Sequence, residues 1–281
     1  GAEGWPAPCK VNRFLHIVGR RDDGYHLLQT VFQLLDYGDT LHFEPLHNGV
    51  ISRVNDVPGV PEADDLIIRA AQLLQQESGC KLGAAIRVDK RTPQGGGLGG
   101  GSSDAATALV ALNHLWGCGF DSARLANLGL QLGADVPVFV HGQTSWAEGI
   151  GEQLQPLELD SAWFIVIKPD CEVPTARIFQ DPGLTRNTAN IKITAFREGL
   201  GNDCEAVVRK HFTPVDRAMR WLSEYAPARL TGTGACVFAI IETRARAQSV
   251  LEDLPATWSG FIAQGVNRSP LHMKLEGLLQ K

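Results

Sequence analysis

Apolar and polar residues alternate near the start of the chain, a pattern typical of strands. Over residues 10–18 one face carries Lys10, Asn12, Phe14, His16 and Val18, and a polar turn follows at residues 19–24. The same criterion predicts further strands at residues 30–35, 40–43, 86–88, 136–140, 163–168 and 261–266, with a strand–turn–strand unit at residues 228–241.

Apolar residues recur at helical spacing in other segments. They predict helices at residues 66–76, 122–132, 203–212, 215–225 and 244–254. A further helix ends at Trp116, and we expect Ser102 or Ser103 to cap its start. Because strands and helices mix without strict alternation, the sequence predicts an α+β fold. A boundary near Pro156 would divide it into domains of residues 1–156 and 157–281.

The composition is that of a globular protein, with 44% hydrophobic and 20% charged residues among 281. With 26 Lys+Arg against 31 Asp+Glu and no basic run, the chain lacks the charge pattern of a nucleic-acid-binding protein. No apolar run approaches the ~20 residues of a membrane span. The cysteines are scattered without a CxxC pair, which favours reduced thiols and a cytoplasmic location. Residues 1–4 lack a starting Met and a signal-peptide core, so we interpret them as a trimmed or added terminus.

A glycine-rich segment lies between a predicted strand and a predicted helix. Six of the seven residues from Gly95 to Gly101 are glycine. The N-terminus of a helix presents unpaired N–H groups and a partial positive charge, and glycine lets the backbone approach an anion closely. Each glycine also costs folding entropy. A phosphate ligand therefore explains this run better than a flexible turn does.

Several known phosphate loops do not fit this segment. A P-loop requires Gly-Lys-Ser/Thr at its end, whereas Ser102 and Ser103 follow Gly101 directly. The spacing of Gly95, Gly97 and Gly100 matches GxGxxG, but a dinucleotide-binding fold needs a strand after the first helix, where a second helix is predicted here. The lysine strand and the His-Arg-Asp and Asp-Phe-Gly elements of protein kinases are missing from the sequence.

Three segments together resemble the motifs of the GHMP kinases, named for galacto-, homoserine, mevalonate and phosphomevalonate kinases. They are Pro6-Ala7-Pro8-Cys9-Lys10-Val11-Asn12, Pro93-Gln94-Gly95-Gly96-Gly97-Leu98-Gly99-Gly100-Gly101-Ser102-Ser103 and Leu230-Thr231-Gly232-Thr233-Gly234-Ala235-Cys236. Others resemble the branch of that family that acts on a cytidine-diphosphate-linked alcohol: Gly24-Tyr25-His26, Leu132-Gly133-Ala134-Asp135-Val136-Pro137-Val138-Phe139 and Asn202-Asp203-Cys204. The resemblance spans nearly the whole chain. It implies a two-domain fold, with an N-terminal S5-like α/β domain and a C-terminal ferredoxin-like domain.

The resemblance also implies a reaction: ATP, with Mg²⁺, phosphorylates the 2-hydroxyl of cytidine-diphosphate-linked methylerythritol on the methylerythritol phosphate route to isoprenoids. Asp135 falls on the catalytic base of the family. Lys10 lies beside it, where its charge would favour an ionised carboxylate and a developing alkoxide.

The resemblance assigns further residues to ligands. Those expected at ATP are Pro93, Gln94, Gly95, Gly96, Gly97, Leu98, Gly99, Gly100, Gly101, Ser102 and Ser103, with Asp65 and Leu66 near the adenine. Those expected at the substrate are Asn12, Tyr25, His26, Thr175 and Phe179. Those expected near the phosphates are Thr231, Gly232, Thr233 and Gly234. The Mg²⁺ ligands are not identified, although Ser102, Ser103 or Asp104 could contact the ion.

Without the resemblance, plainer interpretations would be preferred for several of these residues. Asp135 would be a turn-forming or capping aspartate and Lys10 a solvated strand-end lysine. Tyr25 and Phe179 would be aromatic residues of the core.

Three residues depart from the family pattern. Cys9 and Arg13 occupy positions where the family usually has alanine and leucine, and Asp65 stands where asparagine is expected. Arg13 alternates with apolar neighbours, so the pattern predicts a charge on a buried strand face unless it finds a partner.

Alternative functions remain open at this stage. One is another small-molecule GHMP kinase, acting on homoserine or mevalonate. A second is a catalytically silent nucleotide-binding module, and a dehydrogenase comes last. The sequence does not indicate an oligomeric state.

Overall fold

A long hairpin at the start of the chain organises the fold. In the computed structural model, which describes residues 4–280, strand β1 (Trp5–Arg20) runs antiparallel to β2 (His26–Leu46). The interpretation of residues 1–3 as part of a terminus lies outside this range. The register shifts between Pro8 and Lys10 and again between Asn12 and Leu15. Such irregularities bend a strand and re-aim its side chains.

The hairpin belongs to a sheet that runs through the whole molecule. Across residues 4–280 ten strands form this sheet in the order β3–β4–β2–β10–β7–β9–β8, with β1 and β5 each paired with β2 and β6 paired with β5. Strand β10 pairs with β2 at one end and with β7 along most of its length, so it joins the two halves. The other bounds are β3 (Ile51–Arg53), β4 (Gly83–Asp89), β5 (Ser145–Glu148), β6 (Gln153–Pro156), β7 (Trp163–Lys168), β8 (Arg229–Leu230), β9 (Val237–Ile241) and β10 (Ser259–Val266).

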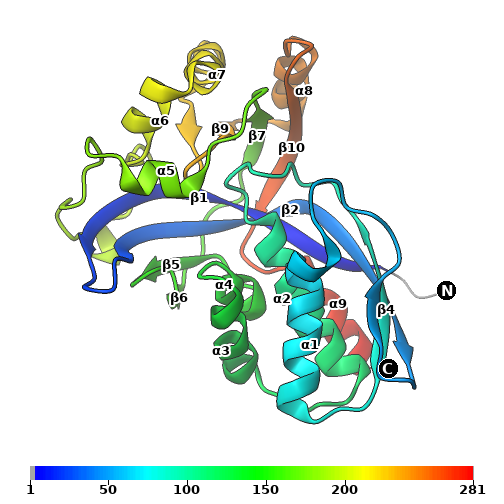
Figure 1. Ribbon diagram of the computed structural model, residues 1–281. Coiled ribbons are helices and arrows are strands. Elements are labelled where there is room, and N and C mark those ends of the chain that lie inside the picture. The colour runs from blue at the N-terminus through cyan, green and yellow to red at the C-terminus, as the bar shows by residue number, and fades with distance from the viewer. Residues whose placement is uncertain (1–3, 281) are drawn as a thin grey trace.

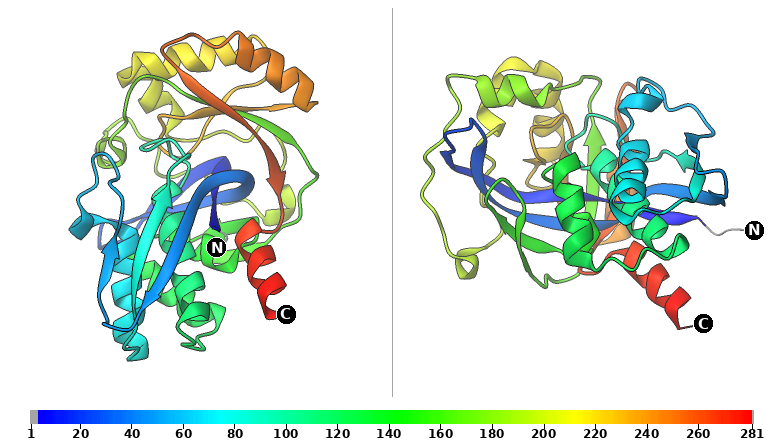
Figure 2. Two further views of the ribbon diagram at one scale, coloured as in Figure 1. Left: turned by 90° about the vertical axis from the view of Figure 1, so that its right-hand side faces the viewer. Right: turned by 60° about the horizontal axis from the view of Figure 1, so that its bottom comes forward.

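Helices cover the two halves of the sheet separately (Figures 1 and 2). One group consists of α1 (Leu66–Ser78), α2 (Gly100–Leu115), α3 (Ser122–Leu132), α4 (Val136–His141) and the final helix α9 (Pro270–Leu279). The other consists of α5 (Thr175–Gln180), α6 (Glu205–His211), α7 (Thr213–Ser223) and α8 (Arg244–Glu252), and 3₁₀ turns occur at η1 (Glu62–Asp64) and η2 (Ile193–Ala195). In the part of the chain that is described, no helix is both long and apolar enough to cross a bilayer.

Each half has its own hydrophobic core. The first packs β2 and β4 against α1–α4, and the second packs β7 and β9 against α5–α8. Helix α9 returns from the second half, and its Leu271, 1% exposed, belongs to the first core. The division at residue 156 stays a prediction, and the last segment of the chain packs across it.

Two local predictions were wrong. Residues 136–140 form helix α4, not a strand, and all five are buried. A short apolar run that is buried on every side carries no periodicity to separate the two states. Helix α2 begins at Gly100 with Gly99 as its N-cap, so neither Ser102 nor Ser103 caps it. The two strands predicted at residues 30–35 and 40–43 are parts of the single strand β2.

Candidate active site

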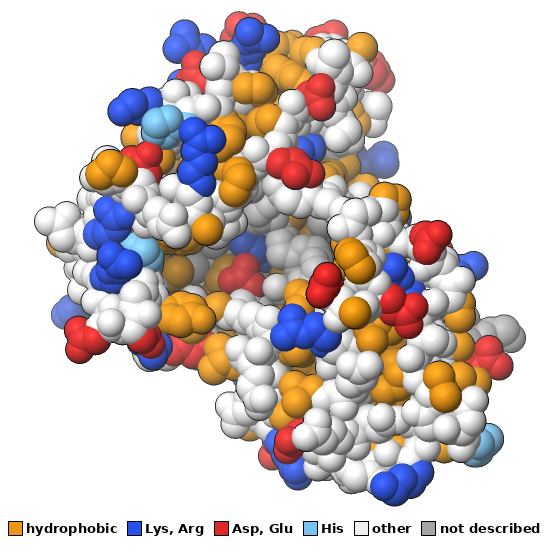
Figure 3. All heavy atoms as spheres, in the orientation of Figure 1, with side chains coloured by type: hydrophobic (Ala, Val, Ile, Leu, Met, Phe, Trp, Pro, Cys, Tyr) orange, Lys and Arg blue, Asp and Glu red, His pale blue; other side chains and the backbone are white. Residues whose placement is uncertain are grey.

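Two cavities meet at the glycine-rich loop. The first, of about 650 Å³, lies between the β1–β2 hairpin, the start of α4 and helix α5. The second, of about 400 Å³, lies between the start of α1 and the loop that leads into α2. Gly97 and Gly99 line both cavities. The surface is hollowed between the two halves of the molecule, with charged side chains of both signs inside the hollow (Figure 3).

Lys10 and Asp135 form an ion pair in the first cavity. Lys10 is 3% exposed, and its Nζ lies 3.4 Å from Asp135 Oδ2. The same ammonium donates to Asn12 Oδ1 at 2.6 Å and to the Gly97 carbonyl at 3.1 Å. Asp135 precedes α4, yet its side chain makes no capping hydrogen bond. The plainer interpretation of Lys10 as a solvated lysine was therefore wrong. Asp135 lies in the turn before α4, as its plainer interpretation allowed, but its side chain does not cap the helix.

Asn12 is held from three sides. Its Nδ2 donates to Thr30 Oγ1 at 3.0 Å, and its backbone N–H donates to Thr231 Oγ1 at 3.0 Å. Because the Lys10 ammonium can only donate, it fixes Oδ1 as the side of the amide that faces it. Thr231 Oγ1 also donates to the Gly97 carbonyl at 3.1 Å, which ties the late motif to the loop. Sequence reasoning missed Thr30, because nothing in the pattern around it separates it from an ordinary strand threonine.

The glycine loop is clamped by its carbonyl groups. The N–H groups of Lys10, Ala235 and Cys236 donate to the carbonyls of Leu98, Gly95 and Gly96 at 3.0, 3.1 and 3.1 Å. The loop therefore contacts the first strand on one side and the late motif on the other.

The amide groups that follow the loop are available to a ligand. The first hydrogen bond of α2 runs from Ser103 N–H to the Gly99 carbonyl at 2.8 Å. The N–H groups of Gly100, Gly101 and Ser102 therefore have no partner within the helix, and they stand at the positive end of its dipole. This arrangement can bind phosphate.

The second cavity gathers almost all the residues expected at ATP. Its lining includes Asp65, Leu66 and every residue from Pro93 to Ser102. Ser103 does not line it, because this buried serine donates to the Pro8 carbonyl at 2.6 Å. Asp65, which stands in place of the expected asparagine, accepts from Ile67 N–H at 2.8 Å at the start of α1 and pairs with Arg53.

A buried charged cluster that sequence reasoning missed supports this cavity. Lys90 Nζ lies 2.8 Å from Asp104 Oδ2 and 2.5 Å from Asp39 Oδ2. Asp39 Oδ1 accepts from the N–H groups of Arg91 and Thr92 at 2.6 and 2.7 Å and so fixes the chain where it enters the loop. Burial raises the pKa of Asp104 well above its ordinary value, while Lys90 opposes that shift.

The donor set is compatible with Mg²⁺ carried by a nucleotide. Asp104 Oδ1 is buried without a hydrogen-bond partner, and Asp104 and Ser102 both line the second cavity. Among residues 4–280 no group of three or more His, Cys, Asp or Glu could hold a metal ion by itself. Mg²⁺ commonly takes only one or two protein oxygens and completes its shell with phosphate and water.

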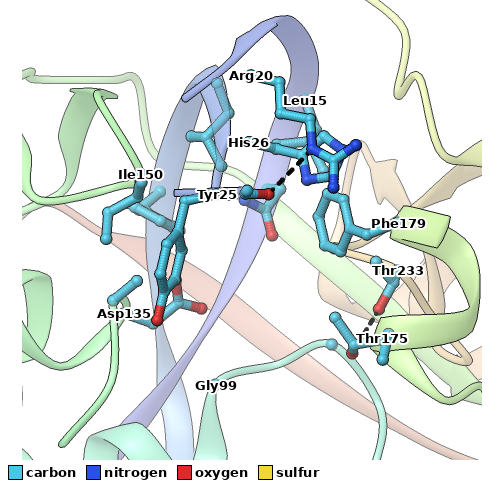
Figure 4. A pocket seen from close by; sticks show the side chains of 18 of the residues that line it. Leu15, Arg20, Tyr25, His26, Gly99, Asp135, Ile150, Thr175, Phe179 and Thr233 are labelled. Carbon is cyan, nitrogen blue, oxygen red and sulfur yellow. Dashed lines mark hydrogen bonds between the residues drawn. The ribbon is translucent and has the colours of Figure 1, made fainter. Parts of the chain in front are cut away.

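Two aromatic side chains lie on opposite sides of the first cavity (Figure 4). Tyr25 stands at the tip of the β1–β2 hairpin, where Gly24 takes a φ of 93°. It is 59% exposed, so its interpretation as a core residue was wrong. Phe179 comes from α5 and is partly buried, with its ring centroid 4.8 Å from that of His26.

The remaining polar substrate residues connect different elements. Thr175 Oγ1 lies 2.9 Å from Thr233 Oγ1, which joins α5 to the late motif. His26 Nε2 accepts from Arg186 Nε at 3.1 Å. Burial lowers the pKa of His26, and the charges of Arg186 and Arg20 lower it further. No pattern in the sequence marks Arg186 as a residue of the site, because it reaches the site from a loop.

Arg13, which departs from the family pattern, is buried as predicted and finds partners. It pairs with Glu198 and donates to Gln33 Oε1 at 2.9 Å. Burial lowers its pKa to about 10, so the side chain stays charged at neutral pH. Cys9 is fully buried, and burial raises the pKa of its thiol.

Comparisons with known proteins agree with this arrangement. Residues 65–143 match the family model for the GHMP kinases N terminal domain, and residues 185–260 match that for the GHMP kinases C terminal. The chain is 58% identical to a 4-diphosphocytidyl-2-C-methyl-D-erythritol kinase of Alkalilimnicola ehrlichii, over 97% of this chain and 94% of that protein. It is 54% identical to a kinase of the same name from Halorhodospira halophila, over 96% of each.

A solved structure is similar over the whole fold. The crystal structure of a 4-(cytidine 5'-diphospho)-2C-methyl-D-erythritol kinase superposes with a TM-score of 0.82 at 30% identity, covering 94% of this chain and 99% of that one. The expected two-domain GHMP kinase fold is thereby confirmed. The chain belongs to the GHMP kinases, in the family of the 4-diphosphocytidyl-2-C-methyl-D-erythritol kinases.

Proposed function

We propose that this ATP-dependent kinase transfers the γ-phosphoryl group of ATP to the 2-hydroxyl of 4-diphosphocytidyl-2-C-methyl-D-erythritol, in the cytoplasm and with Mg²⁺. The observation that carries the proposal is the junction of two cavities at Gly97 and Gly99, beside Lys10 and Asp135. The names of relatives at 54–58% identity support the choice of substrate.

The second cavity would hold the donor. The N–H groups of Gly100, Gly101 and Ser102 would bind its phosphates, and the cavity wall at Leu66 would contact the adenine. Asp104 and Ser102 would hold Mg²⁺, which would supply charge neutralisation at the phosphates when bound.

The first cavity would hold the acceptor, with its hydroxyl at Asp135. Phosphoryl transfer needs positioning, charge neutralisation and a group that takes the hydroxyl proton. Asp135 would accept that proton, and the Lys10 ammonium would stabilise the developing alkoxide. Asn12 would orient the hydroxyl, because its amide is already fixed by Lys10 and Thr30.

The cytosine would lie between Tyr25 and Phe179. Stacking suits a flat base and adds about 0.5–1.5 kcal/mol for each aromatic pair. Tyr25→Ala and Phe179→Ala are each expected to raise the KM for the alcohol substrate while the KM for ATP changes little, which steady-state kinetics at saturating co-substrate would measure. Equal rises in both KM values would indicate a general loss of structure. They would contradict the proposal that the two rings stack on the cytosine.

One experiment tests the proposed reaction. The protein is incubated with Mg-ATP and separately with the cytidine-linked alcohol, homoserine and mevalonate, and products are identified by mass. We expect one added phosphoryl group on the cytidine-linked alcohol alone. Phosphorylation of homoserine or mevalonate instead would establish another GHMP kinase activity. No product from any acceptor, together with measurable ATP binding, would indicate a silent nucleotide-binding module.

A further inference from the structure

Arg186 makes three hydrogen bonds to residues 179–184 and a fourth to His26. Its Nη2 donates to the carbonyls of Phe179 and Asp181 at 2.7 and 2.9 Å, and its Nη1 donates to the Leu184 carbonyl at 3.1 Å. Its Nε donates to His26 Nε2 at 3.1 Å. The residue itself does not line the cavity, whereas His26 and Phe179 do.

This contact determines which nitrogen of His26 carries the proton. A guanidinium has donors only and keeps its charge in proteins, so the nitrogen that faces it must offer a lone pair. His26 Nε2 is then the acceptor, and the neutral ring carries its proton on Nδ1. The lowered pKa of His26 agrees with a neutral ring at pH 7.

The proton on Nδ1 is left for a ligand. Within residues 4–280 no hydrogen bond joins Nδ1 of His26 to another group, and this atom is not among the buried polar atoms without a partner. It is therefore accessible, on a side chain that lines the substrate cavity next to the Phe179 ring.

A fixed N–H donor distinguishes the two pyrimidines. The N3 atom of cytosine accepts a hydrogen bond, whereas the N3–H group of uracil donates one. A ring free to move its proton to Nε2 would accommodate either base. We propose that Arg186 is a positioning residue that holds the proton of His26 on Nδ1 and thereby makes this site select a cytidine over a uridine diphosphate group. The inference rests on the proposed function, because that function brings a nucleobase to the cavity.

Replacing Arg186 is expected to change nucleotide binding differently from replacing a residue that only supports the fold. Loss of a structural contact would weaken binding of both nucleotides equally. If Arg186 no longer holds the proton of His26 on Nδ1, uridine diphosphate binds more tightly. The imidazole can then move its proton to Nε2, and Nδ1 can accept a hydrogen bond from the N3–H group of uracil. A site with a correctly placed hydrogen-bonding group penalises the mismatched ligand by leaving buried groups unpaired.

The test compares Arg186→Met and Arg186→Lys with the control Arg177→Met. Arg177 is an exposed cation of α5 that stacks on Phe212 and has no bond to His26, so its variant removes the same charge nearby. Inhibition constants for cytidine diphosphate and uridine diphosphate are measured at saturating Mg-ATP, and thermal melting reports folding. In the full-length protein without ligand, ¹⁵N NMR of the histidine rings reports the tautomer of His26.

We expect wild-type and Arg177→Met to prefer cytidine diphosphate and to show the proton of His26 on Nδ1. In Arg186→Met the preference falls about tenfold, mainly by tighter binding of uridine diphosphate, and the ring signals move toward the other tautomer. The variant Arg186→Lys, whose ammonium can still donate to Nε2, should keep both the preference and the tautomer. If Arg186→Met melts early, the tautomer of His26 in the wild type decides the question.

Two results would overturn the inference. One is an Nε2–H tautomer in the wild type, and the other is an unchanged preference in folded Arg186→Met. If neither nucleotide competes with the wild-type substrate, the proposed function fails, and the NMR experiment still shows whether Arg186 fixes the ring.

Discussion

Two glycines of the phosphate-binding segment have very different surroundings. A Cβ atom on Gly101 would meet only Leu66 Cδ1 at 3.8 Å, at the edge of the second cavity. A Cβ on Gly99, which has a φ of 70°, would come within 2.9 Å of the Phe139 ring. Gly101→Val is therefore expected to weaken ATP binding strongly with a nearly unchanged melting temperature, whereas Gly99→Val should lower both. Calorimetric titration with ATP and thermal melting measure the two effects, and unaltered ATP affinity in a folded Gly101→Val protein would contradict the phosphate site.

The role of one carboxylate can be tested without changing its shape. If Asp135 takes the hydroxyl proton, Asp135→Asn lowers kcat by roughly 10²–10⁴ while substrate binding survives. The variant also deprives the buried Lys10 ammonium of its paired carboxylate, so kcat is compared in protein that thermal melting shows to be folded. Asp121→Asn is the matched control, since Asp121 caps α3 through Arg124 N–H at 2.8 Å and asparagine caps equally well. Wild-type kcat in Asp135→Asn would show that the carboxylate is not the base.

At the scale of elements, ion pairs hold the segment between α5 and α6 against β1. Glu198 pairs with Arg13, which is buried, and with Arg229 at 2.7 Å. Glu198→Ala would deprive both arginines of their carboxylate, so we expect a loss of about 1–3 kcal/mol in the free energy of unfolding.

Removing the other partner of this ion pair should lower the free energy of unfolding by less. Arg13→Leu leaves Glu198 half-exposed and still paired with Arg229, and it removes a buried charge. Urea unfolding measures both variants. A larger loss for Arg13→Leu than for Glu198→Ala would mean that packing of the arginine over Phe164 and Phe196, not its charge, holds the segment.

Most helices and strands were predicted from the sequence. The local pattern of some others was weak, and at one helix the capping signals were present but not used. Strand β7 was predicted at its observed bounds, because its apolar run is continuous and flanked by polar residues. Helix α9 was missed, although Ser269 caps it and Pro270 opens it, both ordinary start signals. Helix α4 could not have been separated from a strand, since its apolar residues are buried in every direction.

At the scale of the whole molecule, the two halves share parts and are expected to unfold together. Leu271 of α9 is 1% exposed in the first core, whereas Leu279 on the same helix is 68% exposed. Leu271→Ala should cost about 2–5 kcal/mol in a single transition, and Leu279→Ala should change stability by at most ~0.5 kcal/mol. Scanning calorimetry distinguishes these outcomes. Two separate transitions, with only one of them shifted by Leu271→Ala, would mean that the halves are independent.

Assembly of the site was predictable only through motifs. Asp135 is distant in sequence from Lys10 and Tyr25, and the local sequence alone favoured a plain role for each of the three. Their motifs predicted one site, and the fold brings all three to one cavity. Lys90, Thr30 and Arg186 act through side-chain contacts set by tertiary packing, so no local pattern marks them.

The glycine wall between the cavities has a stereochemical consequence. Gly97 and Gly99, which carry no side chains, line both cavities, so a donor and an acceptor bound as proposed would meet there and the phosphoryl group could pass in one in-line displacement. One displacement inverts the configuration at phosphorus. A covalent phosphoryl intermediate on the Asp135 carboxylate would require two displacements, and the second would restore the original configuration. With ATP whose γ-phosphorus is made chiral by oxygen isotopes, the product of this enzyme should carry the opposite hand.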